Sequence, residues 1–207
     1  MSDEPDLKSA YALTSNAEVE ALYNDWAQSY DTGFGQAQGY QSPREIALGF
    51  IGLGGRGPVL DVGAGTGLVA EFLAKAGIGP IDAVDLSESM LDVARSKGIY
   101  RDLIVADVTK PINAPHRYNG IVSAGTFTHG HVGPDGLLPL IDIAEPGAVF
   151  ALSVNREHYD NLGFAVAIDD LSDQITEVKL RDFRIYDDRA DEEHRDDIAS
   201  LLSFTKR

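Results

Sequence analysis

The sequence contains no cysteine, and none of its apolar runs approaches the roughly 18 residues that a membrane-spanning helix needs. The absence of cysteine excludes disulfides, thiolate metal sites and a thiol nucleophile, and it fits a reducing compartment. The first residues, Met1–Asp6, are acidic and polar, whereas a signal peptide begins with basic and then apolar residues. We therefore expect a cytoplasmic protein that has no membrane partner.

Basic residues are also scarce. Lysine and arginine number 17 against 33 acidic residues, which gives a formal net charge of −16. Nucleic-acid binding normally needs clustered cations, and the only basic cluster is the pair Lys206 and Arg207. We expect no nucleic-acid partner, and the acidic surface is compatible with cationic or neutral small molecules. Five scattered histidines without cysteine do not indicate a metal site.

What the chain does contain is enough apolar material for one α/β domain, since 43% of its 207 residues are hydrophobic. From Val59 onward, strand-like and helix-like segments alternate, which predicts a mainly parallel sheet with helices on both faces. The expected strands are Val59–Val62, Ile81–Asp85, Asp102–Ala106, Gly120–Ser123 and Ala148–Val154. The expected helices between and after them are Leu68–Ala76, Ser87–Lys97 with Ser87 as its cap, Leu137–Ile143 and Glu157–Leu171.

The two ends of the chain depart from this alternation. Ile175–Tyr186 and Ile198–Phe204 lack helical periodicity, so we expect an antiparallel hairpin that completes a seven-stranded sheet. Near the amino terminus, residues 17–30 predict a helix with one apolar face, and Ser42 followed by Pro43 predicts the cap and start of another. The predicted fold is a three-layer Rossmann-like sandwich with a helical cap. Residues 1–50 would form a mobile arm (1–16) and a helical lid, and residues 51–207 the ligand-binding part of one structural domain.

The most informative segment is a glycine loop that follows the first strand. Gly63, Gly65 and Gly67 alternate along it before a helix begins, which suits a backbone that lies against a ligand. Dinucleotide sites prefer G-x-G-x-x-G, but here the third glycine comes one residue early and Leu68 takes the dinucleotide position. A nicotinamide-dependent oxidoreductase is therefore a minor alternative. Asp85, at the end of the second strand, would bind ribose hydroxyls in either class.

From Val59 to the carboxyl terminus, the sequence resembles the class I S-adenosylmethionine-dependent methyltransferases. Val59–Gly67 resembles their first motif, and Tyr118–Val122 resembles the fourth, with Asn119 where the family usually has aspartate. Glu145–Ala148 is similar to the turn before the fifth strand. The combination of Tyr23 and Trp26 with a Gly-Tyr-x-x-Pro segment ending at Pro43 resembles small methyltransferase-like proteins that have no settled substrate.

This resemblance implies S-adenosylmethionine as cofactor and S-adenosylhomocysteine as product. Asp85 would bind the ribose, Leu86 and Met90 would pack on the adenine, and Asp107 would accept a hydrogen bond from its amino group. Asp61 would accept from the ammonium group or hold the loop. The full set of expected cofactor contacts is Tyr23, Tyr30, Asp61, Gly63, Ala64, Gly65, Gly67, Asp85, Leu86, Met90, Asp107, Val108, Ala124 and Gly125.

The acceptor side is less defined by the residues. The loop 123–136 follows the fourth strand at its carboxyl end and holds His129 and His131. His129 is the predicted general base, with His131 as a weaker candidate, although alignment alone accelerates many methyl transfers. We expect methyl transfer to an O, N or S atom of a small molecule beneath a lid that carries Tyr23 and Tyr30. The alternative is a catalytically silent module that binds the cofactor. The acceptor and the oligomeric state cannot be read from the sequence.

Overall fold

The computed structural model describes residues 16–128, 131–190, 192 and 194–207. The arm expected over residues 1–16 lies almost wholly outside this part of the chain, and so does His129. In the described part, no helix is long and apolar enough to cross a membrane.

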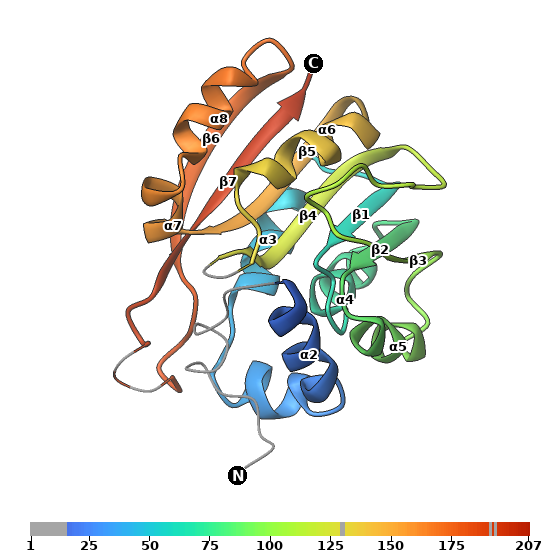
Figure 1. The fold of residues 1–207 in the computed structure, drawn as a ribbon, viewed down its shortest axis with the longest axis vertical. Helices are drawn as coiled ribbons and strands as arrows, with labels where there is room; N and C mark the ends of the chain where they lie inside the picture. The colour runs from blue at the N-terminus through green and yellow to red at the C-terminus, as the bar shows by residue number, and fades with distance from the viewer. Residues whose placement is uncertain (1–15, 129–130, 191, 193) are drawn as a thin grey trace.

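One seven-stranded sheet forms the centre of the molecule, in the order β3-β2-β1-β4-β5-β7-β6 (Figure 1). The first five strands pair in parallel, and β7 runs antiparallel to both of its neighbours. This confirms the predicted parallel sheet and its antiparallel end. The strands are β1 Val59–Val62, β2 Ile81–Asp85, β3 Leu103–Val105, β4 Tyr118–Phe127, β5 Ala144–Asn155, β6 Ile175–Arg184 and β7 Ile198–Lys206.

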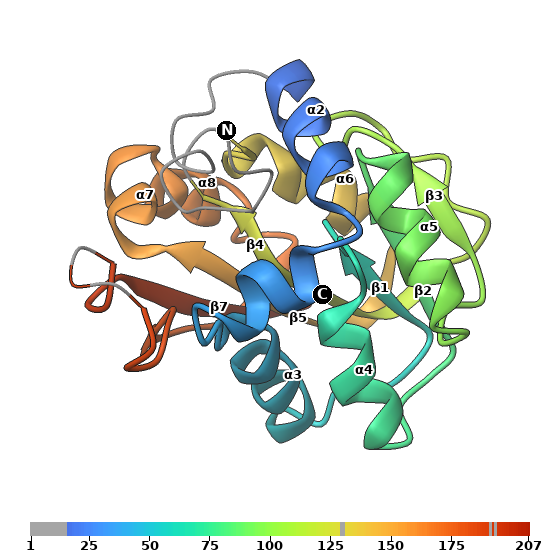
Figure 2. The ribbon, with the colours of Figure 1, turned by 90° about the horizontal axis from the view of Figure 1, so that it is seen from below.

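Helices cover both faces of this sheet and give the predicted three layers (Figure 2). On one face, Ile46 and Phe50 of α3 join Leu73 of α4 in a buried cluster; on the other, Leu140 of α6 and Phe164 of α8 join a second cluster. These apolar contacts hold the strands whose ends carry the site. The helices are α2 Asn16–Trp26, α3 Ser42–Gly52, α4 Leu68–Lys75, α5 Glu88–Ser96, α6 Leu137–Ile143, α7 Arg156–Asn161 and α8 Phe164–Asp170, with a π-helix η1 Tyr30–Gln36 and a 3₁₀ turn η2 Pro134–Gly136.

The amino-terminal region differs most from the prediction. The helix expected over residues 17–30 ends at Trp26, and from Tyr30 the chain forms the π-helical turn η1, which was not predicted. Ser42 is not the cap of α3, because Gln41 holds the cap position without a side-chain hydrogen bond. Since α3 packs on the sheet, the boundary expected after residue 50 falls inside a core helix.

Two other helices test the predicted caps and lengths. The helix expected over Glu157–Leu171 is two helices, α7 and α8, because Gly163 between them takes a left-handed backbone with φ of 78°. Ser87 is confirmed as the cap of α5, since its hydroxyl accepts from the Met90 amide at 3.1 Å.

Candidate functional site

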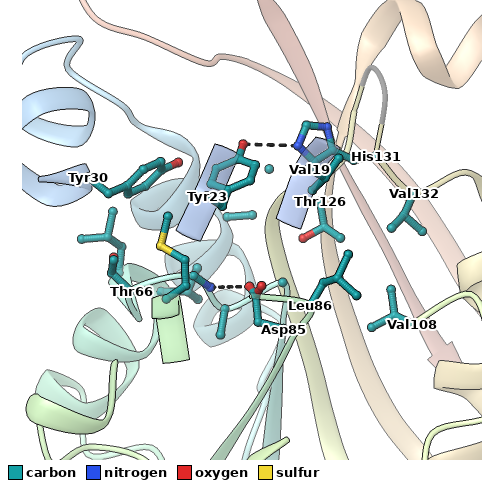
Figure 3. A pocket seen from close by; sticks show the side chains of 18 of the residues that line it. Val19, Tyr23, Tyr30, Thr66, Asp85, Leu86, Val108, Thr126, His131 and Val132 are labelled. Atoms are coloured by element: carbon teal, nitrogen blue, oxygen red, sulfur yellow. Dashed lines mark hydrogen bonds between the residues drawn. The ribbon is translucent and has the colours of Figure 1, made fainter. Parts of the chain in front are cut away.

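A cavity that is partly open to solvent lies at the carboxyl ends of the central parallel strands (Figure 3). This is the edge where open α/β sheets bind ligands, because the loops that leave the strands diverge there. Twelve of the fourteen predicted cofactor contacts line it, all except Asp61 and Gly67. The lining residues are Val19, Tyr23, Tyr30, Tyr40, Pro43, Gly63, Ala64, Gly65, Thr66, Leu68, Val69, Asp85, Leu86, Met90, Ala106, Asp107, Val108, Ala124, Gly125, Thr126, His131 and Val132.

The glycine loop forms the floor of the cavity, and two of its glycines serve different needs. Gly63 has φ of 60°, and a Cβ there would lie 1.9 Å from the Thr126 hydroxyl oxygen, so β1 and the end of β4 approach too closely for a side chain. Gly65 has φ of 53°, but a Cβ there would meet nothing within 4 Å. Its backbone therefore borders open space, as the prediction of ligand contact requires.

Asp85 faces this loop from the end of β2. Its Oδ2 accepts from the Gly65 amide at 2.7 Å, and its Oδ1 accepts from the Ser87 amide at 2.9 Å. Burial raises the pKa of this carboxyl above its ordinary value, although the hydrogen bonds from Ser87 and Gly65 partly offset the rise. The carboxylate is thus fixed beside the open backbone of Gly65, with its position set by the two loops.

Asp61 and Gly67 lie behind the loop, in contact with Tyr100. The Tyr100 hydroxyl donates to Asp61 Oδ2 at 2.6 Å, and a Cβ on Gly67 would lie 2.9 Å from the Tyr100 ring. Asp61 Oδ1 is buried and has no hydrogen-bond partner. Burial raises the pKa of the Asp61 carboxyl to about 7, which the hydrogen bond from Tyr100 moderates. No sequence pattern had pointed to Tyr100.

The side of the cavity expected to hold the adenine is apolar with a carboxylate at its rim. Leu86, Met90 and Val108 line it, and Met90 also packs against Trp26 in a small core cluster. Asp107 Oδ1 accepts from the Thr109 hydroxyl at 2.6 Å, and Oδ2 lies 2.9 Å from Lys110 Nζ. Partial burial would raise the pKa of Asp107, but these hydrogen bonds outweigh it and hold the pKa below its ordinary value. Asp107 therefore stays ionised at neutral pH.

The helix α2 and the turn η1 lie over the opening and bring aromatic side chains to it. The Tyr23 hydroxyl lies 3.2 Å from His131 Nε2, which joins α2 to the loop after β4 (Figure 3). The rings of Tyr23 and Tyr30 have centroids 6.0 Å apart. Trp26, in contrast, is buried in the packing of α2 on α5, as its apolar context indicated.

A partly buried ion-pair group fastens η1 to the glycine loop. Lys97 Nζ donates to Asp31 Oδ2 at 2.7 Å and to Glu71 Oε1 at 2.6 Å, and its side chain is only 17% exposed. The other oxygen of Asp31 accepts from the Thr66 hydroxyl in the loop. Asp31 therefore connects the lid with the loop, α4 and α5, a contact that no sequence spacing had indicated.

Another group of titratable side chains lies outside the cavity. Ligand atoms of Asp82, Asp102 and His116 lie within 4.8 Å of one another. The Arg101 guanidinium, however, donates to both oxygens of Asp82 at 2.9 and 2.6 Å, and the Tyr118 hydroxyl donates to Oδ2 at 2.9 Å. A cation would have to compete with the guanidinium, so this group is an ion-pair network.

Comparisons with known proteins agree with this geometry. Residues 59–141 match the model of a family described as a methyltransferase domain. Methyltransferase-like protein 27 of Homo sapiens is 27% identical over 181 residues, which cover 84% of this chain and 72% of that protein.

Solved structures share the fold. Magnesium protoporphyrin IX methyltransferase from Synechocystis, with bound S-adenosylmethionine, aligns with a TM-score of 0.64 and 17% identity over 95% of this chain and 99% of that one. The N-methyltransferase NodS from Bradyrhizobium japonicum, in complex with S-adenosylhomocysteine, aligns with a TM-score of 0.62 and 13% identity over 88% of this chain and 96% of that one.

Proposed function

Because this chain belongs to the class I S-adenosylmethionine-dependent methyltransferases, we propose that it methylates an O, N or S atom of a small-molecule acceptor bound beneath α2 and η1. The observation that carries the proposal is the cavity itself. It continues past Gly65 and Asp85 to Tyr23, Thr126 and His131, so space for an acceptor adjoins the donor loop. A silent module with a blocked acceptor side is less consistent with that space.

Three features of the chain fit S-adenosylmethionine. The Gly65 backbone borders open space, which suits the methionine part, and Asp85 is held beside it, which suits the ribose diol. Leu86, Met90 and Val108 offer an apolar slot for adenine. When bound, the cofactor supplies a methyl group on a positively charged sulfur.

The residues of the chain would bind, orient and shield the reactants. Alignment of two reactants can lower a barrier by several kcal/mol without a proton-transfer group. Tyr23 and Tyr30 would exclude water from above, and their ring faces would favour a cationic sulfur. His129, the predicted proton acceptor, lies outside the described residues, whereas His131 borders the cavity with Tyr23 at hydrogen-bonding distance.

We also propose a cytoplasmic location, consistent with the absence of cysteine.

The proposal can be tested with S-adenosylmethionine that carries a radioactive methyl group. Protein incubated with this donor and a cell extract should transfer label to the low-mass fraction and release S-adenosylhomocysteine. Asp85→Asn should reduce transfer by roughly 10-fold or more, because a hydrogen bond to a charged group contributes about 1.5–3 kcal/mol. Label found only in the protein or nucleic-acid fraction would contradict a small-molecule acceptor, and no turnover of the donor would contradict the activity.

A further inference from the structure

The cavity has a second half that the proposed donor site does not use. Most of the expected donor contacts come from the loops after β1, β2 and β3, whereas the remaining walls come from α2, the segment around Tyr40, the end of β4 and the loop after it. Tyr23 borders both parts of the cavity. Figure 3 shows Thr126, His131 and Val132 together on one side, with Tyr23 reaching toward His131. We refer to this part, lined by Val19, Tyr23, Tyr40, Pro43, Thr126, His131 and Val132, as the acceptor half.

Its surface is aromatic and apolar. Tyr23 and Tyr40 contribute rings, and Val19, Pro43 and Val132 contribute aliphatic groups. The Tyr40 hydroxyl lies close over the end of β4, since a Cβ on Gly125 would come within 2.5 Å of it. Such a surface favours a ring that packs flat against it, because aromatic pairs add to the free energy of apolar burial.

Apart from the titratable His131, the charged side chains described around the cavity are acidic. Among the described lining residues, the carboxylates of Asp85 and Asp107 are the acidic groups, and none of these residues is lysine or arginine. The nearby cations are already engaged: Lys97 pairs with Asp31 and Glu71, and Lys110 pairs with Asp107. An anionic group on an acceptor would lose its hydration here without a lysine or arginine side chain among these lining residues to replace it.

From this surface and these charges we infer, resting on the function proposed above, that the acceptor is a flat aromatic molecule without a carboxylate or phosphate. Asp85 and Asp107 tolerate a cationic substituent and oppose an anionic one. The acceptor half thus selects against negative charge as well as for an aromatic shape.

Three para-substituted phenols test this inference, because the end of their side chain is neutral, cationic or anionic: 4-ethylphenol, tyramine, and 3-(4-hydroxyphenyl)propionate. Each is titrated into protein saturated with S-adenosylhomocysteine at neutral pH, and its dissociation constant is measured by calorimetry. We expect the neutral and cationic phenols to bind and the carboxylate to bind about 10-fold more weakly or worse. Equal or tighter binding of the carboxylate overturns the charge selection, and failure of all three to bind overturns the aromatic class.

A substitution at Val19 shows whether the selection arises in the acceptor half. Val19 lies on α2, is partly exposed and lines the cavity, so a longer side chain fits without disturbing the core. Val19→Lys should improve binding of the carboxylate about 5-fold and weaken tyramine, whereas Val19→Met should keep the order of the wild type. An unchanged order in Val19→Lys contradicts the inference.

The same titration separates this inference from the function on which it rests. The first step is saturation with S-adenosylhomocysteine alone. If that ligand does not bind, the proposed methyltransferase function is wrong. If it binds and the phenols follow another order, the acceptor class alone is wrong.

Discussion

Asp61 and Asp82 lie one step apart on neighbouring parallel strands, and both are fully buried. Because Asp61 pairs in register with Ala83, the side chain of Asp82 lies on the opposite face of the sheet. Asp82 receives hydrogen bonds from Arg101 and Tyr118. Asp61 has Tyr100 on one oxygen and no partner on the other. Asp82 is therefore a carboxylate that stabilises the fold, whereas Asp61 is left with an unsatisfied oxygen beside the site.

Removal of the charge of Asp82 should have the largest effect on stability. Asp82→Asn leaves the Arg101 guanidinium, one-third exposed, with only its longer ion pair to Asp102 at 3.6 Å. Loss of one member of a buried pair costs about 3–5 kcal/mol, and we expect a value near the lower end because Arg101 reaches water. Chemical denaturation measures this loss. If the comparison is right, the folded variant still binds S-adenosylhomocysteine as the wild type does.

Asp61→Asn should raise the free energy of unfolding, whereas Asp82→Asn should lower it. The size of the gain should depend on pH. The pKa of about 7 lies above the value in the unfolded chain, so the folded protein retains a proton that the unfolded chain releases between about pH 4 and 7. Wild-type stability therefore falls across this window relative to the variant, which does not titrate. At about pH 8 the variant should be more stable by roughly 2–4 kcal/mol, and the difference should vanish near pH 4. A difference independent of pH would show that Asp61 is ionised throughout.

The Lys97 group offers a smaller contrast. It compares a partly buried ion pair beneath η1 with the exposed pair of Arg95 and Asp92 on α5. Lys97→Met removes the cation that joins Asp31 to Glu71, so stability should fall by about 1–2 kcal/mol and affinity for S-adenosylhomocysteine by about 5-fold. Arg95→Met removes an exposed pair with Asp92, and its effect on stability should stay within about 0.5 kcal/mol. Equal effects of the two variants would contradict a special role for the lid contact.

The fold and the cavity at the proposed donor site could be predicted because their signals are local in the sequence. Alternating apolar segments specify a parallel sheet, and glycines at alternate positions after a buried strand specify a loop that admits a ligand. Asp85 was predictable for the same reason, since the end of β2 follows from the strand pattern. Twelve of the predicted contacts line one cavity as a result.

The missed features depend on contacts between distant segments. Tyr100 lies 39 positions from Asp61, and Lys97 lies 66 positions from Asp31, so no spacing rule connects them. The π-helical turn η1 was missed because Gly33 and Gly35 within it suggest a break, while its position is set by the contact of Asp31 with Thr66. In Glu157–Leu171, apolar periodicity concealed the left-handed Gly163 that divides the helix.

The most direct test of the donor site compares two glycines that both have a left-handed backbone. Gly65 lines the cavity, and Gly77 is not among its lining residues. Gly65 and Gly77 both have positive φ, and a Cβ on either would meet no atom within 4 Å. Gly65→Ala and Gly77→Ala should each cost about 1–2 kcal/mol of stability from backbone strain. By calorimetry, wild type and Gly77→Ala should bind S-adenosylhomocysteine with equal affinity, and Gly65→Ala should lose about 30-fold or more, because a methyl group enters the space of the ligand. Equal binding by all three proteins, or by none, would contradict a donor site at the glycine loop.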